Sequence, residues 1–164
     1  MHNLPQRRSI RLQGYDYRLA GAYFVTLCTH QRECLFGDIF DGVMLSNSFG
    51  NMVASAWCWL AEHYPYVDLD TWVLMPNHLH GILVLSSADS ADKPKSLGRL
   101  IGAFKTVSSK AINQVRETPA APVWQRNFYE HVIHNESDLN RIREYILYNP
   151  ARWSEDEENV SRHV

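Results

Sequence analysis

The chain has 164 residues, of which 45% are hydrophobic and 21% are charged, and its formal net charge is −2. This size suits one globular domain with a substantial core, and no apolar run approaches the roughly 20 residues that a membrane helix needs. An odd count of three cysteines without CxxC spacing argues against a disulfide framework, so a reducing, cytoplasmic location is expected.

The first half of the chain predicts strands on either side of one helix. Residues 22–29 are rich in β-branched and aromatic side chains, as in a strand, and residues 34–45 suggest a turn and a short second strand. Apolar spacings of three and four predict a helix over residues 47–63. Residues 67–75 and 78–85 then read as two strands, and the two-residue break between them favours an antiparallel hairpin.

The second half predicts a loop, two helices and a last strand. Residues 86–96 are small and polar, which is typical of a surface loop. A helix is expected over residues 97–116, followed by a strand within residues 123–133. A final helix should begin near residue 137 and stop before Pro150, because the residue before a proline is disfavoured in a helix.

The predicted order is β-β-α-β-β-α-β-α, which favours an α+β sandwich with an antiparallel sheet and helices packed on one face. Residues 1–153 form the expected single domain, with a basic N-terminal arm over residues 1–20. Residues 154–164 form an acidic tail that contains the run EDEE.

Two histidines stand out in the strand 78–85. Side chains at i and i+2 of a strand point to the same face, so His78 and His80 should lie side by side. Two imidazoles at this spacing can hold a divalent metal if a further ligand is supplied. The spacing is equally compatible with one exposed histidine and one hydrogen-bonded core histidine.

The last predicted helix carries a second polar pair. Tyr145 and Asn149 are four residues apart, so a helix places both on one face. The simpler interpretation is a core aromatic residue whose hydroxyl reaches the surface.

Several blocks of the sequence together resemble a known family. They are MPNHLHGI at 75–82, YILYNP at 145–150, WQRNFYEHVI at 124–133, and the N-terminal segments at 7–17 and 23–37. The histidine-hydrophobic-histidine pair resembles the signature of the HUH endonucleases, in their single-tyrosine transposase branch. The set of blocks is similar to the REP-associated tyrosine transposases over nearly all of residues 7–153.

This resemblance implies a ferredoxin-like sandwich with a catalytic tyrosine on a C-terminal helix. It implies Tyr145 as the nucleophile, with Tyr148 as a reserve candidate. A divalent metal, Mg²⁺ or Mn²⁺, would be held by His78, His80 and, as third ligand, Asn149. The implied reaction cleaves and rejoins single-stranded DNA at palindromic hairpins through a 5′-phosphotyrosine, as in DNA transposition and recombination.

The charge distribution supports a nucleic-acid partner without establishing one. Outside residues 154–164 the chain has 15 basic groups (16 less Arg162) and 14 acidic ones (18 less the four of EDEE). Single-strand recognition calls for cations beside aromatic surfaces. The predicted DNA contacts are Arg7, Arg8, Arg11, Lys105, Lys110 and Arg126. A homodimer is possible, and no membrane partner is expected.

Two alternatives remain open at this stage. The chain could be a hairpin-DNA-binding module that keeps the fold without turnover. It could also be a small metallohydrolase or a histidine-triad nucleotide hydrolase, but the triad motif requires a third alternating histidine, where this chain has Ile82.

Overall fold

The computed structural model describes residues 20–86 and 93–160. Its main sheet has four antiparallel strands in the order β4-β5-β1-β6, formed by β1 (Gly21–Cys28), β4 (Val67–Met75), β5 (His78–Leu85) and β6 (Tyr129–Ile133). With α1 (Ser48–His63) and α2 (Leu97–Val115), these strands form a βαββαβ unit, which is the ferredoxin-like arrangement. The predicted α+β fold with an antiparallel sheet is confirmed.

Further elements extend this unit. A separate two-stranded sheet, β2 (Gly37–Phe40) and β3 (Val43–Ser46), is inserted between β1 and α1. At the C-terminal end, α3 (Glu136–Leu147) is followed by the 3₁₀ helix η2 (Pro150–Glu155). A further short 3₁₀ turn, η1 (His30–Arg32), follows β1. The sequence predicted one strand where the hairpin β2–β3 has two.

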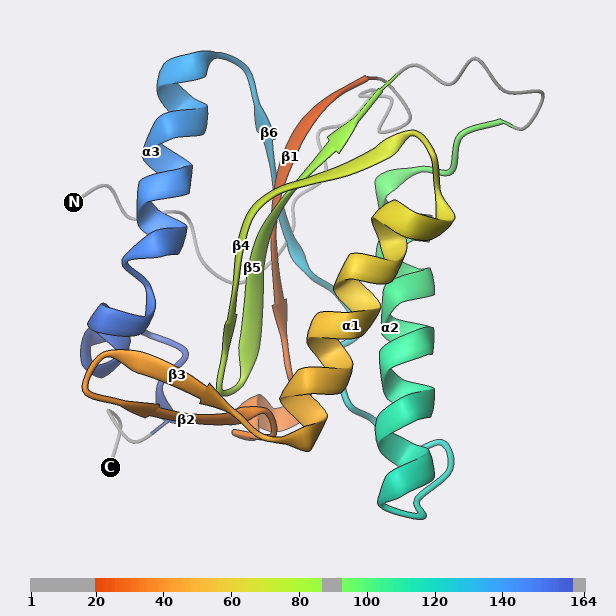
Figure 1. Ribbon diagram of the computed structural model, residues 1–164, viewed down its shortest axis with the longest axis vertical. Coiled ribbons are helices and arrows are strands. Elements are labelled where there is room, and N and C mark those ends of the chain that lie inside the picture. The colour runs from red at the N-terminus through yellow and green to blue at the C-terminus, as the bar shows by residue number, and fades with distance from the viewer. Residues whose placement is uncertain (1–19, 87–92, 161–164) are drawn as a thin grey trace.

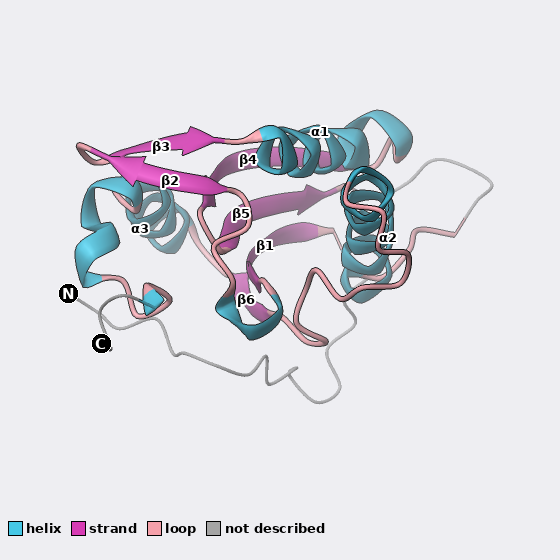
Figure 2. Cartoon of the chain, turned by 90° about the horizontal axis from the view of Figure 1, so that it is seen from below, coloured by secondary structure: helices cyan, strands magenta, loops and turns pink. Residues whose placement is uncertain are grey.

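The helices α1 and α2 cover one face of the sheet, and α3 covers the other (Figures 1 and 2). The main core lies under α1 and α2, where Trp57 and Phe104 pack against alternate residues of β1 and β5. The expectation that all helices pack on one face therefore holds for α1 and α2 but not for α3. Its apolar stripe, Ile142 and Ile146, is buried against Phe24 of β1 and Ile82 of β5.

One glycine of β5 is needed for this packing. A Cβ atom at Gly81 would lie only 2.5 Å from Cζ2 of Trp57, so the α1 layer approaches β5 more closely than any side chain would allow. The strand is thereby covered on both faces, by α1 on one side and by α3 on the other. Among the described helices, none has the length and apolar composition to cross a membrane.

Candidate active site

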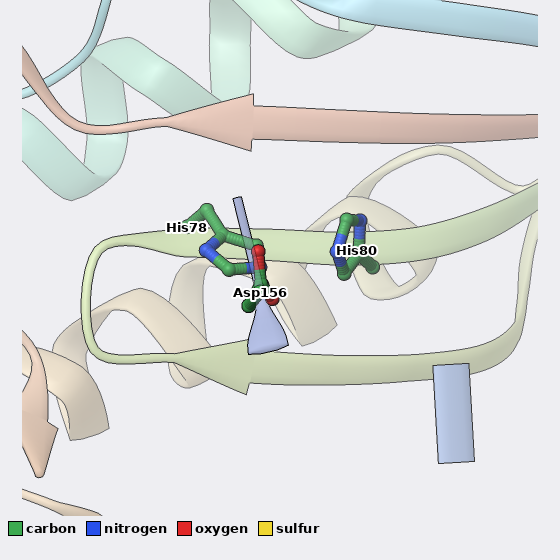
Figure 3. Close-up of side chains that lie close together, drawn as sticks. All are labelled: His78, His80 and Asp156. Carbon is green, nitrogen blue, oxygen red and sulfur yellow. The ribbon is translucent and has the colours of Figure 1, made fainter. Parts of the chain in front are cut away.

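The two histidines of β5 lie side by side on the sheet face that α3 covers. Their ring centroids are 4.5 Å apart, and His78 and His80 are 0% and 4% exposed (Figure 3). The register explains their placement: β1 pairs Cys28 with His78 and Thr26 with His80. The predicted common orientation of the two imidazoles is therefore present, and both are buried.

The orientation of the His78 ring is fixed by the preceding residue. The amide nitrogen of Asn77 donates to the carbonyl oxygens of Arg32 and Glu158, which leaves its Oδ1 as an acceptor. This oxygen lies 2.8 Å from Nδ1 of His78, so Nδ1 carries the proton. Nε2 is then unprotonated and directed into the site, as a metal ligand requires.

A second partner orients His80. The hydroxyl oxygen of Thr26 lies 2.7 Å from Nδ1 of His80. Within the described residues, Nε2 of His80 and Nε2 of His78 are both buried without a hydrogen-bond partner. A buried polar atom normally finds a partner, so two adjacent orphaned nitrogens indicate a site that is completed by something else.

Burial also keeps both imidazoles uncharged. Removal from water lowers the pKa of His78 to about 4, partly opposed by the charge of Glu158 and by the side chain of Asn149. Burial, reinforced by His78, also holds the pKa of His80 well below its usual value. Both are therefore neutral at pH 7, which is the protonation state that binds a metal.

The structure adds a carboxylate that was not predicted as a site residue. Asp156, just after η2, brings Oδ2 to 3.6 Å from Nε2 of His78. One ligand atom from each of His78, His80 and Asp156 lies within 4.8 Å of the others, so this group could hold a metal ion (Figure 3). The sequence placed Asp156 in an acidic tail; the only local signal was an acidic run soon after the last helix.

The backbone around Asp156 is anchored to the site by its neighbours. The guanidinium of Arg32 pairs with Glu158 at 3.2 Å, and Asn77 binds the carbonyl oxygen of the same residue. The carbonyl of Glu157 also accepts from Arg32. These contacts hold the segment after η2 against the end of β5 that carries His78.

Asn149, the predicted third ligand, lies between the histidines and the tyrosine helix. It is 4% exposed, and its Oδ1 is buried without a partner among the described residues. Its side chain influences the pKa of both His78 and Tyr145, so it is adjacent to each. The site thus contains two oxygen donors, Asn149 and Asp156, beside the histidine pair.

Tyr145 contacts the histidine pair within the same chain. Its ring centroid is 5.3 Å from that of His80 and 6.2 Å from that of Phe24, edge-on in both cases. Burial first, and then the charge of Asp156, raise the pKa of Tyr145 to about 12; the side chain of Asn149 opposes this shift. By contrast, Tyr148 is 53% exposed.

The helix that carries Tyr145 is fixed to the edge strand β4 by an ion pair. Arg143 donates from Nε and Nη2 to the two carboxylate oxygens of Asp70, at 2.8 and 2.6 Å. The register of β4 against β5 shifts between Leu69 and Trp72, and Thr71 also donates to Asp70. The pair complements the apolar contacts of α3 with the sheet.

Asp70→Asn should reveal this ion pair in the pH dependence of stability. The hydrogen bonds from Arg143 hold the pKa of Asp70 well below its usual range. A depressed pKa stabilises the fold above the unfolded-state pKa of about 4, and this contribution is lost as pH falls below it. At pH 7 the free energy of unfolding of the variant should be about 1 kcal/mol lower than that of the wild type. The loss is no larger because both partners are partly exposed. Urea unfolding from pH 7 to 2 should show this difference shrinking; a constant difference would contradict the assignment.

The predicted DNA contacts fall into two groups. Arg7, Arg8 and Arg11 lie outside the described residues. Lys105, Lys110 and Arg126 lie together around the C-terminal half of α2, on the side of the sheet opposite the histidines. Lys105 is engaged internally: its ammonium donates to the carbonyl oxygens of Gln125 and Asn127, and burial lowers its pKa to about 8.

Comparisons with known proteins give the chain relatives over nearly its full length. No protein-family model matches it. A protein of Haemophilus influenzae, described only as uncharacterized, is 37% identical over 94% of this chain and 93% of its own length. A putative REP-associated tyrosine transposase of the same bacterium is 26% identical, covering 84% of this chain and 74% of the relative.

Two further comparisons name the same family. The REP-associated tyrosine transposase of Escherichia coli K12 is 31% identical over 52% of this chain and 45% of its own. A solved structure of a REP-associated tyrosine transposase bound to a REP hairpin superimposes with a TM-score of 0.63 at 22% identity, over 87% of this chain and 73% of that one. The fold is therefore shared. The chain is thus similar in sequence to named REP-associated tyrosine transposases and shares the fold of one of them.

Proposed function

We propose that this protein cleaves and rejoins single-stranded DNA at a palindromic hairpin, with Tyr145 as the nucleophile. The observation that carries the proposal is the contact of the Tyr145 ring with His80 inside one chain, 5.3 Å between centroids. A nucleophile beside a candidate metal group is the combination that phosphoryl transfer through a covalent intermediate needs. A second copy of the chain is not required to bring these two groups together.

The residues fit a divalent metal such as Mg²⁺ or Mn²⁺. Nε2 of His78, Nε2 of His80 and a carboxylate oxygen of Asp156 can converge on one point, and Oδ1 of Asn149 is a further oxygen donor. Imidazole nitrogens with oxygen ligands suit Mn²⁺ well, and Mg²⁺ prefers oxygen. When bound, the ion would supply Lewis-acid stabilisation of charge on the phosphate oxygens.

The reaction is a displacement at phosphorus in which Tyr145 supplies the attacking oxygen. The phenolic oxygen of Tyr145 attacks the scissile phosphorus, so that an O–P bond forms while the bond from phosphorus to the 3′-oxygen breaks. The phenolic proton leaves to solvent, and the departing 3′-oxygen takes up a proton to become a 3′-hydroxyl. The product is a 5′-phosphotyrosine, and attack by a 3′-hydroxyl reverses the step.

The burial of Tyr145 has a chemical consequence. With a pKa near 12, the free enzyme holds the phenol neutral at pH 7. The proton must therefore leave as the nucleophile attacks, and the Asn149 side chain, which opposes the rise in pKa, favours the anionic phenolate. Phe24 contacts the ring edge-on from the sheet side.

Adduct capture tests the proposal. Single-stranded DNA that folds into a hairpin with unpaired flanks is incubated with the protein and Mn²⁺, and the products are separated under denaturing conditions. A DNA-linked protein band that requires the metal and disappears with a chelator is expected. Binding of the hairpin without an adduct at any Mn²⁺ or Mg²⁺ concentration would favour the alternative, a hairpin-DNA-binding module without turnover.

A further inference from the structure

The described part of the structure contains a large concavity that the candidate active site does not use. This open recess has a volume of about 770 Å³ and lies between the C-terminal half of α2 and the segment 117–126. The segment turns back toward β6 (Figure 1). Because α2 and α3 cover opposite faces of the sheet, this concavity and the histidine pair are separated by the sheet. Its volume is within the range of small-molecule sites.

Hydrogen bonds between α2 and the segment 117–126 form the wall of this concavity before any ligand binds. Asn113 donates from Nδ2 to the carbonyl oxygen of Ala121 at 2.9 Å, and the indole of Trp124 donates to the hydroxyl oxygen of Ser108 at 3.0 Å. Lys105 donates to the carbonyl oxygen of Gln125 at 2.8 Å. Three bonds of different types thus fix the segment along its length, so the concavity exists without a ligand.

The segment also contains strained backbone. Glu117 and Ala120 have φ angles of 54° and 65°, a left-handed backbone conformation that residues other than glycine rarely adopt. Each costs on the order of 1 kcal/mol or more, and such residues cluster at ligand sites. The same segment supplies an apolar lining, residues 119–124, chiefly proline, alanine and valine.

Free positive charge stands at the edge of this apolar lining. Lys110 and Arg126 are both exposed, and neither pairs with a carboxylate within the described residues. Glu117 is the single acidic residue among the described residues that line the concavity. An apolar recess beside two free cations matches a molecule with a flat ring at one end and a phosphate at the other.

We propose that this concavity binds an unpaired nucleotide of the DNA, with the base against the 119–124 lining and the phosphate toward Lys110 and Arg126. The inference rests on the proposed function for its ligand class and adds a second DNA contact on the far side of the sheet. A volume of about 770 Å³ is large enough for one nucleotide. The site contributes affinity and leaves the chemistry at Tyr145 unchanged.

Charge and shape are tested separately. Lys110→Gln with Arg126→Gln should weaken binding of a labelled oligothymidine of about ten nucleotides by about tenfold or more, with a salt dependence that falls by about one unit per lost phosphate contact. Ser109→Phe fills the concavity without changing charge and should weaken the same complex. The matched control is Lys95→Gln with Arg99→Gln, which removes two exposed cations at the other end of α2; less than about a threefold change is expected.

Three results would overturn the inference. They are an equal loss of affinity in the control pair, an equal loss for a blunt duplex of the same length, and unchanged binding in Ser109→Phe that folds normally by circular dichroism. Adduct formation at saturating DNA should keep its wild-type rate in the control pair, Lys95→Gln with Arg99→Gln. If the wild type binds through this concavity but forms no adduct, the proposed catalysis fails and this inference stands.

Discussion

Tyr145→Phe is expected to abolish the covalent protein–DNA adduct and to leave DNA binding intact. The change removes only the phenolic oxygen, and the ring keeps its edge-on contacts with His80 and Phe24. If this oxygen is the nucleophile, the rate of adduct formation should fall by at least about 10³-fold. Adduct yield with hairpin DNA and Mn²⁺, together with the binding affinity of the same DNA, measures both quantities.

Tyr148→Phe is the matched control, because the same atom is lost three residues further along the chain. Its ring is 53% exposed and lies near the guanidinium of Arg152, at 5.9 Å. Little change in adduct yield is expected. A Tyr145→Phe protein that still formed the adduct at the wild-type rate would transfer the role to another tyrosine and would show that the His80 contact is only structural.

Local periodicity predicted most of the elements because each burial pattern is encoded over a few residues. The hairpin of β4 and β5 follows from the break at Pro76-Asn77, and its strands match the predicted ranges. The i, i+2 rule likewise gave the common face of His78 and His80. These inferences need only the strand period, which tertiary structure did not override here.

The side of the sheet that α3 covers could not be predicted in the same way. The stripe of Ile142 and Ile146 shows that one helix face is buried but does not identify the surface that buries it. One signal was present: residues 82–85 of β5 are apolar at every position rather than at alternate ones, which indicates a strand covered on both faces. The helix that covers the second face had to come from elsewhere in the chain.

Asp156 was not predicted for a different reason. It is 78 positions from His78, and an acidic run near a chain end is normally solvated, because carboxylates are rarely buried without a partner. The contact depends on Arg32 and Asn77, which bind the segment around Glu158 through backbone and ion-pair contacts. No periodicity in the sequence encodes such long-range contacts.

His80→Ala should remove metal binding as well as catalysis. The two imidazole nitrogens without hydrogen-bond partners are explained if an ion binds between them. The substitution leaves only one imidazole for that ion. Affinity for Mn²⁺ should fall at least about 100-fold, and adduct formation should fall with it. In the wild type, Mn²⁺ at about 100 times its Kd should stabilise the fold by about 2.7 kcal/mol, and this increase should be absent in the variant.

His63→Ala is the control for His80→Ala, because it also removes one histidine but leaves the buried pair intact. His63 is exposed at the end of α1, where its ring stacks on Trp59 at 4.7 Å, on the layer opposite α3. It should keep both the Mn²⁺-dependent rise in thermal stability and the adduct. If His80→Ala were stabilised by Mn²⁺ as strongly as the wild type, the ion would bind elsewhere, and the buried pair would be a hydrogen-bonded part of the core held by Thr26 and Asn77.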